Sequence, residues 1–259
     1  MRWLIKKIFK KIFKFFGLEV KTYQPELNQM SFDQIYSKLL KDEIIIFDVG
    51  ANKGQSIERF NKLFSNKNIH SFEPIKFEFL NLKKRYASES SIHLNNIALG
   101  NKKEEKDFYI NYYTGSSSFL KTRDNTEWLK LRSKQFKLKP EEFLKDKKKI
   151  KIDTLDNYCL EKKIDNIDIV KIDVQGYEDK FLEGCKQMIE KKKIKFIELE
   201  IILSDVYEKT LTIGEIENKL KSNYRLFAND YYGNLYSCMI YQLNLIYINN
   251  DFFDKIKNK

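Results

Sequence analysis

The side chains in this sequence best suited to chemistry are carboxylates that follow short apolar runs. Asp48 ends the run that begins at Ile44, Glu73 follows Phe72, and Asp173 ends the apolar segment that begins at Ile167. Open parallel α/β sheets bind their ligands at the carboxyl ends of the strands. We therefore expect these carboxylates at the ligand-binding edge of a sheet, where they favour a cationic ligand or accept a proton.

A glycine-spaced loop follows the first apolar run. Its sequence is Asp48-Val49-Gly50-Ala51-Asn52-Lys53-Gly54-Gln55, and its glycines permit a tight turn with close backbone approach to a ligand. A dinucleotide fingerprint needs G-x-G-x-x-G, but Asn52 and Gln55 occupy its second and third glycine positions. An acid before the loop suits S-adenosylmethionine, which carries a sulfonium and an amino group. The alternative is a plain strand-to-helix turn without a ligand.

Glu73 lies nineteen residues after Gly54, where nucleotide-binding α/β units place the carboxylate that binds ribose hydroxyls. The alternative is a surface glutamate that caps the next helix. Further along the chain, Asn95-Asn96-Ile97-Ala98-Leu99-Gly100 closes a strand with polar groups that could face an adenine. These segments extend the predicted cofactor site beyond the glycine loop.

A carboxylate at the ligand-binding edge of the sheet could also act as a general base. Asp173 is our first candidate for this general base, followed by Glu200 on the next predicted strand and then by His93. Asp173 could instead orient the cofactor or pair with Lys171, which shares its face of a regular strand. Asp173 and Glu200 could also bind Mg²⁺. The sequence contains no diagnostic ligand set, so we expect no metal.

The elements that must position these residues alternate between strands and helices. We expect strands at 44–49, 69–73, 91–97, 108–113, 167–174 and 195–202, and helices at 31–40, 55–64, 76–86, 155–160, 178–189 and 213–220. Short strands near Tyr224–Phe227, Leu235–Cys238 and Leu243–Ile248 then predict an antiparallel hairpin at one sheet edge. The fold class is α/β, with a mostly parallel sheet.

The chain has 259 residues, of which 42% are hydrophobic, enough for one large α/β domain. Its three cysteines are widely spaced and form no C-x-x-C pair, which predicts reduced thiols in a cytoplasmic protein without a zinc site. The net charge is +11, with +6 in residues 1–16 and +7 in residues 121–151, so the rest carries −2. Two basic segments suit a membrane-surface enzyme, whereas a nucleic-acid-binding protein predicts a basic body.

Residues 1–16 predict an amphipathic helix ended by Gly17. Leu4, Ile8 and Ile12 recur at helical spacing, and lysines occupy the other face. The apolar runs are too short to span a bilayer, but the pattern fits a helix lying on an anionic membrane surface. The alternative is a helix packed on protein. Residues 121–151 predict either a flexible lid that touches substrate or a solvated pair of surface helices.

Six segments together resemble the FkbM family of S-adenosylmethionine-dependent methyltransferases. They run in the family's order from about Ile44 to Glu200 and comprise Asp48–Gln55, Phe72-Glu73-Pro74, Asn96–Gly100, Gly115–Ser118, Asp153–Asp156 and Lys171–Glu178. The sequence departs from the family pattern at Gln175, where glutamate is common. That change removes a charge from the predicted site without affecting cofactor binding.

The resemblance implies a Rossmann-like class I methyltransferase fold and an O-methyltransferase that acts on a sugar hydroxyl of a bacterial surface glycan or glycolipid precursor. From the residues themselves we expect a basic amphipathic helix at 1–20, which would hold the enzyme at the inner face of the membrane, and one domain at 21–259 with a basic insertion at about 121–150. The alternatives are a nucleic-acid methyltransferase and a non-catalytic protein of the same fold. The implied cofactor-binding residues are Asp48, Gly50, Asn52, Gly54, Glu73, Pro74, Asn96 and Asp173, and the catalytic candidates are Asp173 and Glu200.

Overall fold

The computed structural model describes residues 9, 13–17, 30–233 and 240–258. The chain divides into two compact units, residues 1–35 and 36–259. In the first unit, residues 13–15 are helical, and Gly17 adopts a left-handed φ of 73° as the Gly17 N–H donates to Lys14 O at 3.0 Å. Most of the predicted helix at 1–16 lies outside the described residues, so the boundary between residues 1–20 and 21–259 stays a prediction.

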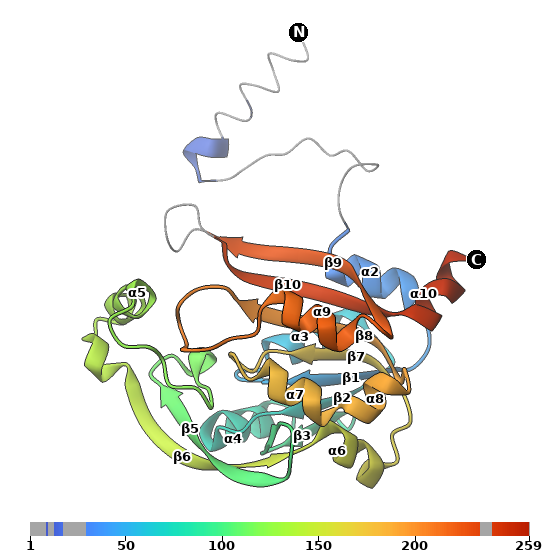
Figure 1. The fold of residues 1–259 in the computed structure, drawn as a ribbon, viewed down its shortest axis with the longest axis horizontal. Helices are drawn as coiled ribbons and strands as arrows, with labels where there is room; N and C mark the ends of the chain where they lie inside the picture. Colours follow the sequence, from blue (N-terminus) through green and yellow to red (C-terminus); the bar gives the residue numbers. More distant parts are fainter. Residues whose placement is uncertain (1–8, 10–12, 18–29, 234–239, 259) are drawn as a thin grey trace. The chain divides into compact units, whose positions relative to one another are not determined.

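Seven strands form the central sheet in the order β3-β2-β1-β7-β8-β10-β9 (Figure 1). Strands β3, β2, β1, β7 and β8 are parallel, and β10 is antiparallel to both neighbours, which confirms the predicted edge hairpin. The predicted strand at Leu235–Cys238 lies outside the described residues. The strand bounds are Ile44–Val49 (β1), Lys67–Phe72 (β2), Ile92–Asn95 (β3), Ile167–Ile172 (β7), Ile194–Ile202 (β8), Tyr224–Gly233 (β9) and Ile240–Asn249 (β10).

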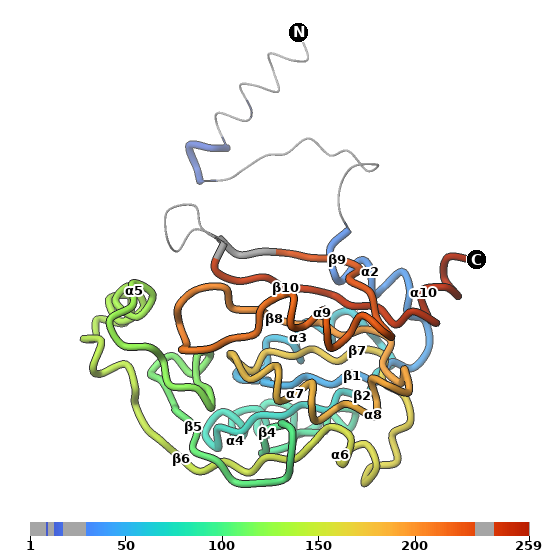
Figure 2. The backbone as a smooth tube through the Cα atoms, viewed as in Figure 1, coloured from blue at the N-terminus to red at the C-terminus, as the bar shows by residue number. Residues whose placement is uncertain are grey.

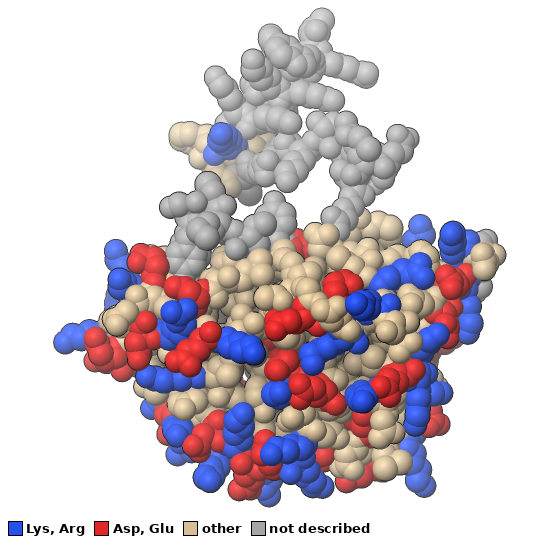
Figure 3. All heavy atoms as spheres, viewed as in Figure 1, with Lys and Arg blue, Asp and Glu red and all other residues tan. Residues whose placement is uncertain are grey.

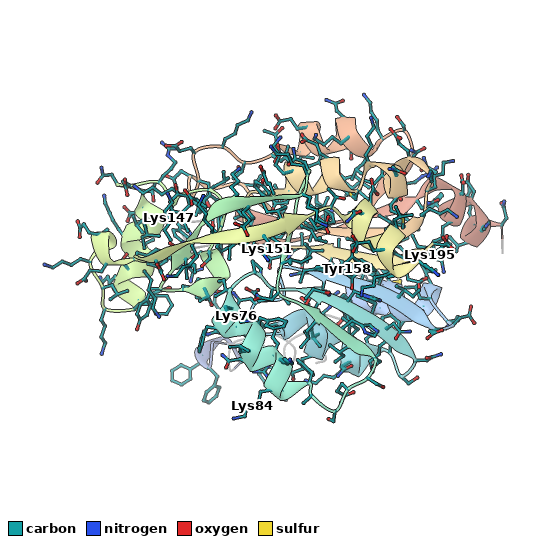
Figure 4. All side chains as sticks on the ribbon, turned by 90° about the horizontal axis from the view of Figure 1, so that it is seen from below. Lys76, Lys84, Lys147, Lys151, Tyr158 and Lys195 are labelled. Carbon is teal, nitrogen blue, oxygen red and sulfur yellow. The ribbon has the colours of Figure 1, made fainter. Side chains whose placement is uncertain are left out.

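Helices cover both faces of this sheet. Phe47, Val170 and Leu199 pack in one buried cluster with side chains of α6 (Leu155–Lys162), α7 (Glu178–Gly184), α8 (Lys186–Glu190) and α9 (Ile213–Leu220). The opposite face carries α3 (Gln55–Leu63) and α4 (Lys76–Arg85), and Figure 4 shows Lys76 and Lys84 on α4 there. Two further helices are α2 (Phe32–Leu39) and α10 (Asn250–Lys257). The sequence analysis did not predict α10, which the Asn249 side chain caps.

A second sheet of three strands, which the sequence analysis did not predict, has the order β4-β6-β5. Its strands are β4 (Ala98–Leu99), β5 (Glu104–Asn111) and β6 (Leu144–Asp153), and Figure 2 traces β6 along β5. β6 carries lysines of the basic insertion, with Lys147 and Lys151 spaced along it in Figure 4. The Lys147 ammonium lies 2.8 Å from the Asp107 carboxylate on β5, so opposite charges meet across the two strands.

The basic insertion has its own buried core. It contains α5 (Glu127–Gln135), the 3-10 turn η2 (Pro140–Glu142) and most of β6, and a second 3-10 turn, η1 (Thr114–Ser116), precedes it. Trp128 and Phe143 pack with Val206 and Tyr207, which follow β8. The predicted solvated helix pair therefore does not form, because the second segment is a strand and the aromatic rings are buried.

The charged side chains of the two signs are intermixed on the face drawn in Figure 3. No helix in the part of the chain that the structure describes is long and apolar enough to cross a membrane.

Candidate active site

The loop after β1 is held between the ends of β2 and β7. The backbone N–H groups of Gly50 and Ala51 both donate to Phe72 O at 3.0 Å, and the Asp173 N–H donates to Val49 O at 3.0 Å. Gly50 has a φ of 88°, and a Cβ at this position would lie only 1.9 Å from the Asp173 carbonyl oxygen. Glycine is therefore required where the loop passes the end of β7.

Glu73 is buried beside this loop with only 4% of its surface exposed. One carboxylate oxygen accepts the backbone N–H of Asn52 at 2.7 Å, and the other accepts that of Ile75 at 2.7 Å. The Asn96 amide donates to the carbonyl oxygens of Glu73 and Pro74 at 2.9 and 3.0 Å. The structure thus brings Asn52, Glu73, Pro74 and Asn96 together. Burial raises the pKa of Glu73 to about 7, although the two backbone donors oppose the shift.

A row of charges crosses the sheet below the loop. Asp48 on β1 is opposite Lys171 on β7 in the strand register. The Lys171 ammonium lies 3.1 Å from Asp173 and 3.9 Å from the fully buried Asp48, which confirms the predicted ion pair with Asp173. Burial lowers the pKa of Lys171, but the surrounding carboxylates outweigh it and raise the pKa above its ordinary value. Asp48 Oδ1 accepts no hydrogen bond from the described residues, and burial raises the pKa of Asp48 to about 6.

The amide of Gln175 joins the two predicted catalytic carboxylates. Its nitrogen donates to Asp173 Oδ1 at 2.8 Å and to Glu200 Oε1 at 2.9 Å. The other oxygen of Glu200 accepts the side-chain amide of Gln242 on β10. Burial, reinforced by repulsion from Asp173, raises the pKa of Glu200 to about 8. Asp173 and Glu200 therefore form a single polar cluster at the ends of β7 and β8.

Residues that the sequence analysis did not single out complete this cluster. Tyr207 donates its phenolic hydrogen to Ser116 O at 2.8 Å and contacts Gln175 Oε1 at 3.3 Å. Thr114 donates to the buried Glu78 at 2.8 Å and lies 3.4 Å from the Asn52 amide. In the sequence, only the segment Gly115–Ser118, which resembles a segment of the FkbM family, indicated that this region contributes to the site.

Two residues considered in the sequence analysis lie away from the carboxylates. His93 lies on β3, with β2 and β1 between it and β7, and its ring centroid is 4.6 Å from that of His70. Gly54 begins α3, and a Cβ there would lie 2.7 Å from a methyl group of Leu82 on α4. Gly54 therefore permits helix packing, and its contact with a cofactor stays a prediction.

The residues around the loop fit S-adenosylmethionine. The carboxyl groups of the buried Asp48 and Glu73 and of the partly exposed Asp173 lie around the loop, which favours a ligand with a sulfonium and an amino group over a pyrophosphate. Asp48 Oδ1 is also a buried acceptor without a hydrogen-bond donor in the described part of the chain. In the part of the chain that the structure describes, no group of three His, Cys, Asp or Glu residues could hold a metal ion.

The order of the strands and the glycine loop match a Rossmann-like class I methyltransferase, and the family that the chain matches identifies it as one, with S-adenosylmethionine as its cofactor. The model of the methyltransferase FkbM domain matches residues 48–227, and the chain belongs to this family. The chain is 26% identical over 194 residues to the 2-O-methyltransferase NoeI of Sinorhizobium fredii NGR234, which covers 73% of this chain and 76% of NoeI.

Solved structures show a similar arrangement at low sequence identity. Methyltransferase FkbM from Methylobacillus flagellatus KT matches with a TM-score of 0.47 and 14% identity, over 86% of this chain and 46% of that protein. TrmK of M. capricolum, solved with S-adenosyl-homocysteine, matches with a TM-score of 0.43 and 14% identity, over 86% of this chain and 70% of TrmK. The present chain therefore spans less than half of the Methylobacillus protein.

Proposed function

We propose that the protein is an O-methyltransferase that acts on a sugar hydroxyl of a bacterial surface glycan or glycolipid precursor. The observation that carries this proposal is the cluster of Asp173, Gln175 and Glu200, which lies where the Gly50 loop meets the end of β7. A hydroxyl acceptor needs a proton acceptor next to the methyl donor, and this cluster supplies carboxylates at that position.

S-adenosylmethionine supplies a methyl group bonded to a positively charged sulfur. Glu73, with its backbone held by Asn96, would bind the ribose hydroxyls, and the Gly50–Asn52 backbone would approach the methionine part. Asp173 would accept the proton of the acceptor hydroxyl, while Lys171 and Gln175 orient its two oxygens. Glu200, bonded to the amides of Gln175 and Gln242, would support this arrangement or take the proton in its place.

Transfer to a hydroxyl oxygen is supported by the name of the relative NoeI, a 2-O-methyltransferase. The basic amphipathic segment at residues 1–16 would hold the enzyme at an anionic membrane surface, close to lipid-linked sugars. The division into residues 1–20 and one methyltransferase domain at 21–259 belongs to the same proposal.

The test has two stages. First, calorimetry measures S-adenosylmethionine binding by wild type, Asp173→Asn and the matched surface variant Glu190→Gln. Second, transfer of a labelled methyl group to saccharides is followed, and the products are hydrolysed to locate the methyl ether. We expect Asp173→Asn to lower kcat by about 10²- to 10⁴-fold, and Glu190→Gln to retain it. A folded wild type that binds no S-adenosylmethionine, or that methylates nitrogen instead of oxygen, would overturn the proposal.

A further inference from the structure

Aromatic side chains and an arginine gather at one place where the insertion meets the end of β5. The Tyr113 ring stacks on Phe136 with a centroid distance of 5.9 Å, and the Tyr112 ring lies 5.5 Å from the same phenylalanine. The Arg132 guanidinium lies 5.5 Å from the Tyr113 ring centroid and 5.7 Å from that of Trp128. We call Tyr112, Tyr113, Arg132 and Phe136 the aromatic platform.

The platform adjoins both halves of the proposed active site. Tyr113 directly precedes Thr114, whose hydroxyl lies 3.4 Å from the Asn52 amide in the cofactor loop. A few residues further on, Ser118 donates to the backbone oxygen of Gln175 at 2.7 Å. A Cβ on Gly115 would lie 2.8 Å from the Tyr113 ring, so this ring folds back over the turn that joins the two contacts. A ligand on the platform would therefore lie beside the methyl donor and the proposed base.

Parts of the platform are exposed or lack a hydrogen-bond partner in the described part of the chain. Tyr112 and Tyr113 are 49% and 36% exposed. Arg132 donates to Gln135 at 3.0 Å through one terminal nitrogen, and its buried Nε has no hydrogen-bond partner among the residues that the structure describes. The Arg132 side chain is half-buried, and a guanidinium with an unpartnered N–H favours an anionic ligand.

We propose that the aromatic platform is the acceptor subsite and binds a sugar ring that carries or adjoins an anionic group, either a carboxylate or a phosphate. The proposal rests on the methyltransferase function proposed above and specifies the class of its acceptor.

The chemistry of each side chain fits one part of such a ligand. The exposed parts of the Tyr112 and Tyr113 rings offer apolar surface to the C–H face of a pyranose. The planar guanidinium presents paired N–H donors that match carboxylate and phosphate oxygens. Burial raises the pKa of the Tyr113 phenol. The positive charge of Arg132 opposes this shift, and the carboxylates of Asp173 and Glu200 increase it. An anionic group held by Arg132 would orient the ring, with one hydroxyl directed toward Asp173.

The experiment uses the full-length protein saturated with S-adenosyl-homocysteine on an array of matched glycans. Each set contains a glucose-terminated oligosaccharide, its glucuronate-terminated counterpart and its glucose-phosphate counterpart. The variants are Tyr113→Ala, Tyr113→Phe, Arg132→Gln and Arg132→Lys. Lys134→Gln is the matched control, because it removes one exposed charge from the same helix. Calorimetry with S-adenosyl-homocysteine verifies that each variant is folded and retains its cofactor site.

We expect binding to be confined to the anionic members, and the preferred member identifies the anion as carboxylate or phosphate. Arg132→Gln and Tyr113→Ala should each weaken binding about ten- to hundredfold. Tyr113→Phe and Lys134→Gln should retain most of it, whereas Arg132→Lys should retain only part, because lysine keeps the charge but loses the paired N–H donors. With a glycan that is methylated, the two loss variants should raise KM more than they lower kcat.

Equal binding of the neutral and anionic members, or unchanged binding by Arg132→Gln and Tyr113→Ala, would overturn the acceptor subsite. The methyltransferase proposal would still stand if the wild type methylated a glycan in that case. If the protein bound no member in the presence of S-adenosyl-homocysteine and methylated none when supplied with S-adenosylmethionine, both proposals would fall.

Discussion

The backbones of Gly50 and Asp173 are in close contact, since a Cβ on Gly50 would lie 1.9 Å from the Asp173 carbonyl oxygen. Gly50 begins the loop that follows β1, and Asp173 follows β7, the neighbouring strand in the sheet. The proposed cofactor loop and the proposed base are thus fixed relative to each other by backbone contact, independently of any side chain.

Gly50→Ala should therefore damage the site more than a small side chain suggests. The new methyl group would clash with backbone that cannot rotate away, and alanine also disfavours a φ of 88°. We expect about 2–4 kcal/mol of lost stability and loss of S-adenosylmethionine binding in calorimetry. Gly214→Ala is the matched control, because nothing lies within 4 Å of its Cβ position near the start of α9. Equal thermal midpoints for the two variants would refute the close approach.

Glu73→Gln tests the proposed ribose contact. The isosteric amide keeps one acceptor oxygen but places an NH₂ group against a backbone N–H, either that of Asn52 or that of Ile75. We expect S-adenosylmethionine to bind about 10- to 100-fold more weakly, with only a small change in the thermal midpoint of the free protein. Calorimetry at fixed pH measures this affinity, and an unchanged dissociation constant would remove Glu73 from the cofactor site.

The stability of the cofactor-free protein should fall as the pH rises from 6.5 to 8. Burial raises the pKa of Glu73 to about 7, of Glu178 to about 7 and of Glu200 to about 8. The folded chain therefore retains protons that the unfolded chain has already released, so its advantage at low pH is lost as these carboxyls ionise. Burial also lowers the pKa of His70 to about 4, and this histidine acts on stability only below about pH 6.5.

Urea denaturation across this pH range measures the effect. Glu200→Gln, which cannot ionise, should make the decline in the free energy of unfolding shallower than in the wild type. A free energy of unfolding that is constant or increases from pH 6.5 to 8 in the wild type would contradict the raised pKa values.

Gln175→Glu tests the amide bridge. The variant would place a third carboxyl beside Asp173 and Glu200 and remove both donated hydrogen bonds. We expect it to lose about 1–3 kcal/mol of stability at pH 8, with much of the loss regained at pH 6, where added protons can bridge the carboxyl oxygens. Thermal midpoints at the two pH values provide the measurement. A variant as stable as the wild type at pH 8 would show that the bridge is dispensable.

Removal of residues 1–16 tests the membrane prediction from the sequence. The deleted segment carries six lysines and arginines and no acid. We expect the truncated protein to remain in the supernatant when sedimented with vesicles rich in anionic lipid, while the full chain pellets with them. S-adenosylmethionine binding by both proteins controls for folding. Equal sedimentation of the two would show that the segment does not mediate attachment.

The elements predicted most closely were those with a strong local signal. The bounds of β1 at Ile44–Val49 and of α9 at Ile213–Leu220 match the prediction, because a buried parallel strand is a continuous apolar run and α9 has a capping Thr212. β6 was missed because lysines fill its exposed length, and its pairing with β5 depends on acids distant in the sequence. The predicted helix from 178 to 189 is interrupted at Cys185, next to Gly184, whose Cβ would lie 1.8 Å from Gly100 O.

The residues of the candidate site also divide into those with a local signal in the sequence and those whose contacts depend on distant parts of the chain. Asp48, Glu73 and Asp173 could be predicted because Asp48 lies at the end of β1 while Glu73 and Asp173 directly follow β2 and β7, and position in a parallel sheet determines where such residues lie. The contact made by Tyr207 could not be predicted, because its hydrogen-bond partner Ser116 lies 91 residues earlier in the chain, in the 3-10 turn η1 after β5. Gln175 was noted only as a departure from the family pattern, and its bridging contacts depend on β7 and β8 being adjacent.

The buried cluster of the insertion, built on Trp128, Phe143 and Tyr207, shares no residue with the cluster beneath the central sheet. Tyr207 nevertheless links the insertion to the proposed active site, because it packs in the insertion cluster and bonds to Ser116 and Gln175. A substitution that displaced Tyr207 would therefore disturb both the insertion and the polar cluster of Asp173 and Glu200.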